Sequence, residues 1–546
     1  METMKRRALS GTPVQFPVMM ASSTLASSFA PNLSGQLVSR LISFGINMYL
    51  LRRISGDLLG VVNVSLTLFY TTTIFLVREP FRKAFLSNDI PLSRVVNHLW
   101  LSPLICPLVA LSLYSLIWVP FSTVPPLELV HSYEWALFAF GFAAWLEAVA
   151  EPFVIVSLRL AMDAQYALAQ GLLVVTQRIA VIVLLFFTPM PHITIFCCAQ
   201  VFASLFYLIV CVLFVFRRTR LRSYHIVGVS SFRATLPTFR EGFSKKDLSV
   251  LGTFALHSAF KQVLTDGTSY VLTFTDRFTL SDKAVFDAVD KLGSLVARVV
   301  LAPLEHSAYL FFSANLRRDV PIEKQQQDEV KRAVSTLEGL LHLTVVTGVI
   351  VCVFAVPYSP LAVSIYGGDL LSKNSGAAIL RFYCVYIVII AVNGITECFA
   401  MATMSSAQLF SHGWFLFIAS PLHVLLSFLF SFYIGSYGLI LANVVNMCAR
   451  ISYSWTHTRR LFSPYGVSIC ASLPTPSTVI LLLFCLAVSS LSLVIFGNTS
   501  GIIHNAAHIT TGGALLLFVL NHVYQTDIKL ARFISQQLSL THVSVE

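Results

Sequence analysis

Ionisable side chains recur inside the long apolar stretches of this sequence. At the centre of a bilayer, each such charge costs about 2.5–3.5 kcal/mol. A chain that carries many of them therefore needs either an interior polar cavity or partners of opposite charge. The residues in question are Arg40, Glu147, Glu151, Arg178, Lys261, Asp266, Arg298, Glu305, Arg381, Glu397 and Arg450.

The spacing of these charges places several of them on common helix faces. Asp287, Lys291, Ser294, Arg298 and Glu305 are separated by 4, 3, 4 and 7 residues, so on a continuous helix they form one polar stripe. Other shared faces are formed by Arg40, Ser43 and Asn47, by Glu147 and Glu151, and by His257, Lys261 and Thr265. We expect such faces to line an interior cavity.

Fixed cations in a cavity suit an anionic headgroup, and the planar arginine fork suits a diphosphate in particular. We expect Arg40, Lys261 and Arg298 to hold such a group, with Arg381 and Arg450 as secondary candidates. Polar residues that could bind sugar hydroxyls or gate the cavity are Asn47, Glu147, Glu151, Asp266, Asp287, Glu305 and Glu397. The alternative is that charges such as Glu147, Glu151, Arg178 and Glu397 pair and lock helices together.

Motifs of known enzyme chemistry are missing from the sequence. It contains no GxxxxGK[ST] phosphate loop, no GxGxxG after a strand, no HExxH and no GxSxG. His504 and His508 are four residues apart but have no third ligand, and the ten cysteines form no CxxC pair. We therefore expect no enzyme activity, no metal site and no cofactor.

The elements that must position these residues are membrane spans. Of 546 residues, 56% are hydrophobic and 12% charged, and the mean hydropathy is +0.76, which is typical of a polytopic membrane protein. We expect an all-α fold with about 14 spans, near 33–51, 61–77, 97–119, 133–157, 166–187, 193–216, 248–275, 284–314, 338–357, 377–404, 412–432, 436–457, 476–496 and 502–524. The polar segment from Pro321 to Leu337 is expected to form a separate surface helix.

A weak internal repeat indicates that the membrane part is duplicated. Val61 to Ser87 and Val285 to Leu310 superpose with shifts of 223 and 224 residues, which align Pro80 with Pro303. The expected organisation is a tail (1–32), an N-lobe (33–216), a basic linker (217–247), a C-lobe (248–457), two peripheral spans (476–524) and a second tail (525–546).

Positive charge predicts the orientation. With both termini in the cytoplasm, 25 Lys and Arg residues lie on the cytoplasmic side, and the other side holds only Arg52, Arg53, Arg277, Lys283 and Lys373. The net charge of +11 is accordingly attributed to loops that face anionic lipid, so no nucleic-acid partner is expected. Asn498 begins a sequon in a lumenal loop that is too short for glycosylation to be expected.

Several motifs resemble the signature of the Rft family of endoplasmic-reticulum oligosaccharide-lipid translocation proteins, in the multidrug/oligosaccharidyl-lipid/polysaccharide flippase superfamily. They are Gly60 to Val64, Arg78-Glu79 with Arg82, Ala302 to Glu305, Asn393 to Phe399, and Gly438 to Asn443 with Asn446 and Arg450. The sequence departs from the family pattern at Pro80.

The resemblance implies two six-helix lobes related by a pseudo-twofold axis, with two peripheral helices. It also implies a function: alternating-access transfer of a dolichol-diphosphate-linked oligosaccharide from the cytosolic to the lumenal leaflet, for N-glycosylation. Two alternatives stay open. One is a non-transporting scaffold that presents this lipid to lumenal enzymes, and the other is an ion-coupled small-molecule antiporter that uses Glu147 and Glu151. Membrane lipids are expected partners, and the sequence indicates no oligomeric state.

Overall fold

The computed structural model describes residues 42–86, 92–122, 125–126, 133–160, 162–220, 232–237, 242–318, 320–468, 472–496, 502–527 and 530. Within these ranges every regular element is a helix, and no strand occurs. Arg40, the 1–32 tail, Asn498 and most of the 525–546 tail lie outside the described residues. The first described helical segment covers residues 42–53, the second part of the first expected span.

The helices of the first half follow the expected spans but run longer. They are α3 Gly56–Gly60, the π-helical η1 Val61–Leu66, α4 Thr67–Phe85, α5 Leu92–Leu99, α6 Ser102–Leu113, the π-helical η2 Tyr114–Trp118, α7 Val119–Phe121, α8 Tyr133–Arg159, α9 Asp163–Phe187 and α10 His192–Arg220. Elements α3, η1 and α4 form one uninterrupted path that contains Pro80 without a break. The departure at Pro80 therefore leaves the helix intact.

The second half begins after the short 3-10 helix η4 Phe232–Thr235. Its elements are α11 Lys245–Phe274, α12 Leu280–Val296, the π-helical η5 Ala297–Leu301, α13 Ala302–Asn315, η6 Ile322–Lys324, α14 Gln327–Lys373, α15 Gly376–Thr403, α16 Ser406–Ile434, α17 Ser436–Leu461, η7 Ser463–Tyr465, α18 Pro476–Phe496 and α19 Ile502–Thr526. Side-chain caps mark several starts. Thr279 before α12 and Ser405 before α16 each form a capping box with the residue three positions on.

The prediction of a separate surface helix over Pro321 to Leu337 is wrong. Residues from Gln327 onward are the first turns of α14, which continues to Lys373. Val330, Ala333 and Leu337 repeat at helical spacing and are fully buried in a cluster with Phe312 and Phe399. This buried stripe gives the segment a core to pack against, so the polar residues around it form only the outer face.

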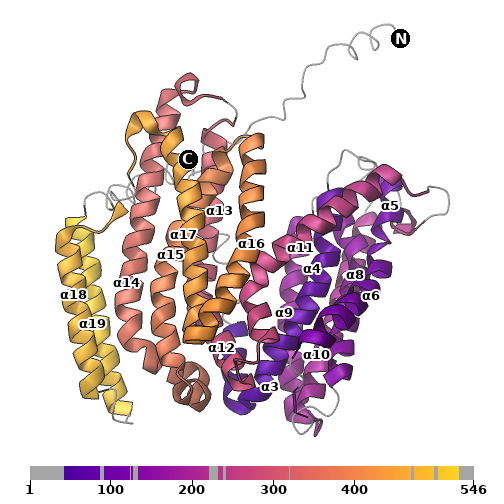
Figure 1. Ribbon diagram of the computed structural model, residues 1–546, viewed down its shortest axis with the longest axis horizontal. Helices are drawn as coiled ribbons and strands as arrows, with labels where there is room; N and C mark the ends of the chain where they lie inside the picture. Colours follow the sequence, from indigo (N-terminus) through magenta and orange to yellow (C-terminus); the bar gives the residue numbers. More distant parts are fainter. Residues whose placement is uncertain are drawn as a thin grey trace.

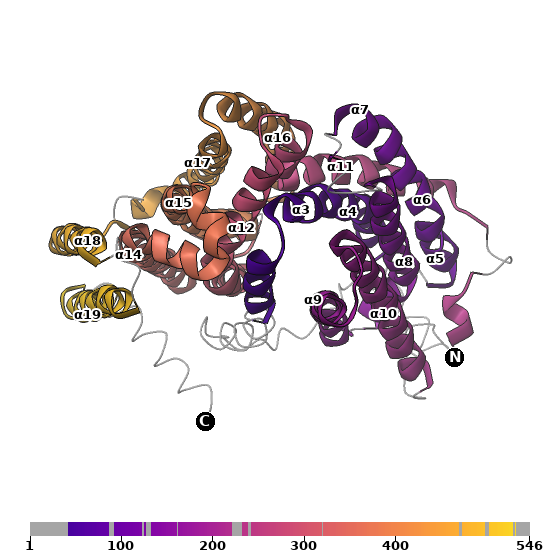
Figure 2. The same cartoon turned by 90° about the horizontal axis from the view of Figure 1, so that it is seen from below.

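The helices form two groups that stand side by side (Figures 1 and 2). One contains α3 to α10 and the other α12 to α17, while α18 and α19 lie outside α14. Helix α11 packs against both α4 and α16, and α12 packs against α3, so these helices join the groups. The groups meet at the α3–α12 end and are spread apart at the other end (Figure 1).

Gly60 makes the α3–α12 contact possible. A Cβ atom at Gly60 would lie 2.0 Å from the backbone oxygen of Leu280, closer than any side chain permits. Only a residue without a side chain lets the two backbones approach in this way. The contact closes the space between the two groups at that end.

Ten described helices are long and apolar enough to cross a membrane, judged by length and composition. The prediction of an all-helical polytopic membrane protein is thereby confirmed. The count of fourteen spans, the pseudo-twofold axis and the domain boundaries stay predictions. Helices α11, α12 and α17 are not among the ten.

Candidate functional site: a polar cavity between the helix groups

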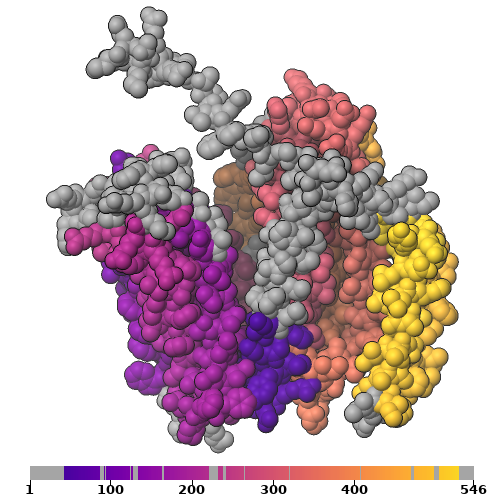
Figure 3. Space-filling view, turned by 180° about the vertical axis from the view of Figure 1, so that it is seen from behind, coloured from indigo at the N-terminus to yellow at the C-terminus, as the bar shows by residue number. Residues whose placement is uncertain are grey.

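A cavity of ≈780 Å³ lies between the two groups of helices. Side chains from η1, α4, α11, α12, α15, α16 and α17 line it. The space-filling view shows the molecule hollowed between its purple-magenta and salmon halves (Figure 3). Helices α11, α12 and α17, which are not among the ten apolar spans, are all among the walls.

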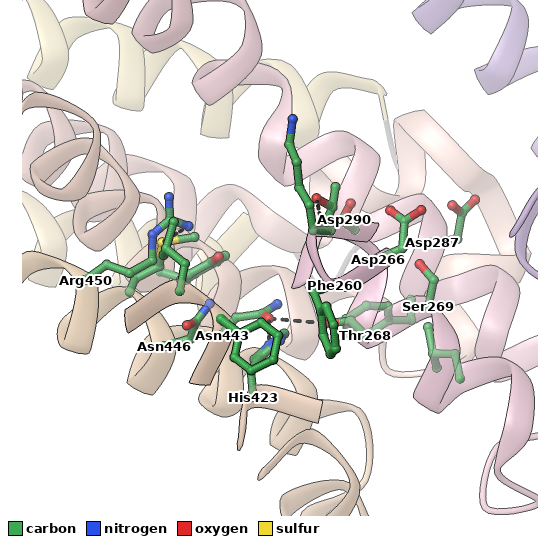
Figure 4. Close-up of a pocket in the computed structure, with 18 of the residues that line it drawn as sticks. Phe260, Asp266, Thr268, Ser269, Asp287, Asp290, His423, Asn443, Asn446 and Arg450 are labelled. Atoms are coloured by element: carbon green, nitrogen blue, oxygen red, sulfur yellow. Dashed lines mark hydrogen bonds between the residues drawn. The ribbon is translucent and has the colours of Figure 1, made fainter. Parts of the chain in front are cut away.

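The cavity carries charges of both signs. Figure 4 shows Asp266, Asp287 and Asp290 toward one side, and Arg450, the two asparagines Asn443 and Asn446, and His423 toward the other. The ionisable residues that line it are Lys83, His257, Lys261, Asp266, Asp287, Asp290, Glu397, His423 and Arg450. The site thus combines cations for an anionic group with acceptors for hydroxyl groups.

Lys261 of α11 enters the cavity beside α4. Its Nζ lies 2.8 Å from Glu79 Oε1 and 5.6 Å from the centre of the Phe75 ring, and its side chain is 47% exposed. Lys83 lies 3.5 Å from the same Glu79 oxygen, and its Nζ is 3.2 Å from His257 Nδ1. Two lysines therefore share one carboxylate, which leaves this wall with an excess of positive charge.

Arg450 of α17 is held by Glu397 of α15. Its Nη2 donates to both carboxylate oxygens, at 2.7 and 2.5 Å, and Asn393 Nδ2 donates to Glu397 Oε2 at 2.9 Å. The Nε of Arg450 is buried and has no hydrogen-bond partner among the described residues. The guanidinium is thus fixed in place while one of its donors stays unsatisfied.

The acidic wall contains a kink in α11. Asp266 departs from helical geometry, with φ −107° and ψ 17°, and accepts a hydrogen bond from Gln262 Nε2 at 2.6 Å. On α12, Asp287 pairs with Lys291 at 2.7 Å, and Asp290 accepts from Tyr383 Oη at 3.0 Å. These three aspartates line the cavity, and their carboxylate oxygens suit the hydroxyl groups of a polyol ligand.

The two signature asparagines of α17 also line the cavity. Asn443 Oδ1 accepts hydrogen bonds from Thr268 Oγ1 at 3.2 Å and from His423 Nε2 at 2.7 Å. It therefore ties α11, α16 and α17 together at one point. Asn446, one turn further along α17, is 9% exposed and lies beside it (Figure 4).

Other residues expected at the site lie outside the cavity. Arg298 binds Ser294 Oγ and, at 3.3 Å, the Lys291 carbonyl of its own helix, and Arg381 Nε donates to the Val356 carbonyl at 3.3 Å. The others outside it are Asn47, which donates to Tyr366 Oη at 3.0 Å, and Glu305, which packs against Gly394. None of the four is among the residues that line the cavity.

The acidic residues of the first half form a separate buried network. Glu151 is 2% exposed and is paired with Arg82 through two hydrogen bonds, of 2.5 and 2.9 Å. Glu147 is 3% exposed and accepts hydrogen bonds from Tyr70 and from Ser204 Oγ. These contacts fit the interpretation in which charges lock helices together.

Sequence reasoning missed Asp290, Lys83 and His423 as cavity residues. Asp290 lies three positions after Asp287 and so on the same face of α12, a signal that the sequence already carried. Lys83 belongs to a basic cluster after the second expected span, and such clusters are more often topology signals than ligands. No pattern in the sequence singles out His423.

Comparison with solved structures defines the class of protein to which this fold belongs. The lipid II flippase MurJ in an inward closed conformation superposes with a TM-score of 0.58 at 13% identity, covering 91% of this chain and 100% of that chain. An inward-facing multidrug-resistance MATE family transporter of the MOP superfamily gives a TM-score of 0.50 at 16% identity, covering 82% and 98%. The chain has the fold of these membrane transporters.

Sequence comparison identifies the family within that class. The Rft protein family model matches residues 23–537, so the chain belongs to the Rft protein family. The chain is similar to the Man(5)GlcNAc(2)-PP-dolichol translocation protein RFT1 of Caenorhabditis elegans, with 38% identity covering 92% of this chain and 97% of the relative. The protein of the same name from Mus musculus is 34% identical, covering 93% and 96%.

Proposed function

We propose that the chain moves a dolichol-diphosphate-linked oligosaccharide of the Man(5)GlcNAc(2) type from the cytosolic to the lumenal leaflet of the endoplasmic-reticulum membrane. The names of its relatives and its transporter fold support this substrate and this activity. The observation that carries the proposal is the ≈780 Å³ cavity, because it offers cations and hydroxyl acceptors between two groups of helices. No chemical reaction is part of the proposal.

In this mechanism the diphosphate exchanges with carboxylates. Lys261 and Arg450 are paired with Glu79 and Glu397, which limits the cost of holding cations within the membrane. A diphosphate also offers pairs of anionic oxygen acceptors, with more negative charge, so it competes for both cations. The glycan would then occupy the hydrated space beside Asp266, Asp287 and Asp290.

The lipid enters from the end at which the helix groups are spread apart. The basic ends of α4, α10 and α17 lie at this end, as does the start of α11. The positive-inside rule therefore assigns it to the cytoplasm, with both termini on that side. Opening of the α3–α12 contact, as the lobes 33–216 and 248–457 move, would release the headgroup to the lumen.

Leaflet transfer by the purified chain tests this proposal. Liposomes would contain the protein and a labelled Man(5)GlcNAc(2)-PP-dolichol, with the outer pool measured by an added glycosidase that cannot cross the membrane. Transfer that scales with protein content and is absent for labelled phosphatidylcholine supports the proposal. Binding of the lipid without transfer supports the scaffold instead, and ion-driven efflux of small molecules supports the antiporter.

A further inference from the structure

A second cavity, of ≈740 Å³, lies at the end of the second helix group. It is bounded by the segment between α13 and α14, the turn between α15 and α16, and the last turns of α17. Among the residues that line it are Arg317, Gln325, Thr403, Ser405, His457 and Arg460. None of them lines the central cavity, so this is a separate site.

The charge of this second cavity differs from that of the central one. Arg317 and Arg460 line it, and no aspartate or glutamate is among the described residues that do so. Neither arginine forms an ion pair with any described residue, whereas Lys261 and Arg450 are paired. Two exposed guanidinium groups thus border a cavity rich in hydroxyl and amide groups.

Hydrogen bonds fix the walls of the second cavity. Arg318 clamps the α13–α14 segment to the end of α15, with Nε 3.1 Å from the Ala402 carbonyl and Nη2 2.8 Å from the Met401 carbonyl. The side chain of Gln325 accepts from the Arg317 N–H at 3.0 Å and donates to the carbonyls of Arg317 and Val320. Arg317 is therefore held at the cavity by its backbone, and its side chain is left for a ligand.

Helix α16 adds to the positive potential. Its N-cap Ser405 lines the cavity and accepts a hydrogen bond from the Gln408 N–H at 3.2 Å. The helix runs for 29 residues, and the N-terminus of such a helix favours negative charge. From the cavity, α16 continues with the exposed side chains Phe410 and Trp414, which suit a lipid environment.

We propose that the second cavity binds a phosphate group, and that an anionic phospholipid headgroup supplies it. Two arginine forks that have no acidic partner in the described part of the chain match the oxygens of a phosphate monoester. The position of the cavity at a helix end beside apolar, exposed α16 favours a lipid over a soluble ion. Such a lipid would bind to one helix group only and would not enter the central cavity.

Binding of phosphatidylinositol 4-phosphate to the full-length purified chain tests this site. Native mass spectrometry would compare the wild type with the Arg317→Ala/Arg460→Ala variant, with phosphatidylcholine as the neutral lipid. The matched control is Lys324→Ala/Arg459→Ala, which removes two exposed cations that are close in sequence but do not line the cavity. The Arg317→Lys/Arg460→Lys variant keeps both positive charges but lacks the planar guanidinium groups that can each donate two parallel hydrogen bonds.

We expect the alanine variant to lose at least tenfold in affinity for the phosphoinositide, the lysine variant to lose less, and the control to bind as the wild type does, all at unchanged melting temperature. Equal losses in the alanine variant and the control, or no loss in either, would overturn the proposal.

Binding of inositol 1,4-bisphosphate, the soluble headgroup of the phosphoinositide, distinguishes a lipid ligand from a soluble phosphate compound. Weak binding of this soluble headgroup supports a lipid ligand, and binding as tight as that of the lipid overturns the assignment to a membrane lipid.

Discussion

Arg450 illustrates how a cation is stabilised in the central cavity. Its carboxylate partner Glu397 compensates the charge, and its Nε is buried without a hydrogen-bond partner among the described residues. The charge of Lys261 is compensated less completely than that of Arg450, because Lys261 shares the Glu79 carboxylate with Lys83. In the proposed mechanism, oxygens of the diphosphate would replace the carboxylate of Glu397 at Arg450 and that of Glu79 at Lys261.

A first prediction concerns the Glu397→Gln variant. The amide cannot neutralise Arg450, so the cation has more to gain from a diphosphate, and we expect the lipid-linked oligosaccharide to bind several-fold more tightly. The same change should lower the free energy of unfolding by about 1–3 kcal/mol, because the pair is mostly buried. Affinity and thermal unfolding of the purified variant measure the two effects. Weaker binding than in the wild type would show that Glu397 itself contacts the substrate.

At the residue scale, five of the residues that the sequence placed in a cavity line it, namely Lys261, Asp266, Asp287, Glu397 and Arg450. Their roles in binding stay predictions. The signature asparagines Asn443 and Asn446, for which no place was predicted, line the same cavity.

The sequence prediction failed for Arg298 for a geometric reason. The side chains of α12 that line the cavity are Phe286, Asp287 and Asp290, whereas Lys291 and Ser294 of the expected stripe do not line it. Arg298 is hydrogen-bonded to both of these residues and lies outside the cavity with them.

At the scale of single helices, the buried Arg82–Glu151 pair positions α4 against α8. Arg82 Nη1 also donates to Tyr166 Oη at 2.6 Å, and so includes α9 in the same contact. The pair lies outside the central cavity, so its role is to hold the first helix group together. Arg82 belongs to the family signature, and this structural role explains its presence there without any contact with a substrate.

The Arg82→Ala variant tests this structural role. Removing one partner leaves Glu151 buried and uncompensated, which costs about 3–5 kcal/mol in comparable pairs. We expect a lower melting temperature in detergent and unchanged affinity of the remaining folded protein for the lipid-linked sugar. The double variant Arg82→Met/Glu151→Leu should recover much of the loss. Failure of this rescue would indicate that the charges serve more than packing.

Helix boundaries were predictable where an apolar run is bounded by charged residues, as for α8, or by Ser, Pro or Gly residues, as for α15 and α18. The start of α14 was not, because the segment from Gln327 is polar overall and its buried stripe is narrow. The kink at Asp266 was also hidden, since nothing but Gly267 beside it breaks the helical pattern. In both cases tertiary packing decides the outcome, and a single sequence does not contain it.

At the scale of the whole molecule, the proposed leaflet transfer requires the α3–α12 contact to open and close. Gly60 is the residue that permits the closed arrangement, because a Cβ atom there would collide with the Leu280 carbonyl oxygen. A Gly60→Val variant should therefore shift the population toward molecules that are open at this end. A cysteine substituted for Asn63, which lines the cavity near α3, would report the shift.

We expect a membrane-impermeant thiol reagent, added from the lumenal side, to label Asn63→Cys faster in the Gly60→Val background than with Gly60 intact. Gly45→Val is the control, since a Cβ at that position meets no atom within 4 Å. Identical labelling rates in the two backgrounds would mean that this contact does not gate the cavity.

The central claim is that the cations lining the cavity, and no others in the spans, bind the diphosphate. Affinity for Man(5)GlcNAc(2)-PP-dolichol, measured on two double variants with matched charge loss, tests it most directly. Lys261→Ala/Arg450→Ala removes cations that line the cavity, and Arg298→Ala/Arg381→Ala removes two that do not. Since charge-assisted hydrogen bonds contribute about 1.5–3 kcal/mol each, we predict a loss of at least tenfold for the first variant alone. Wild-type affinity in the first variant, or an equal loss in both, would contradict the account.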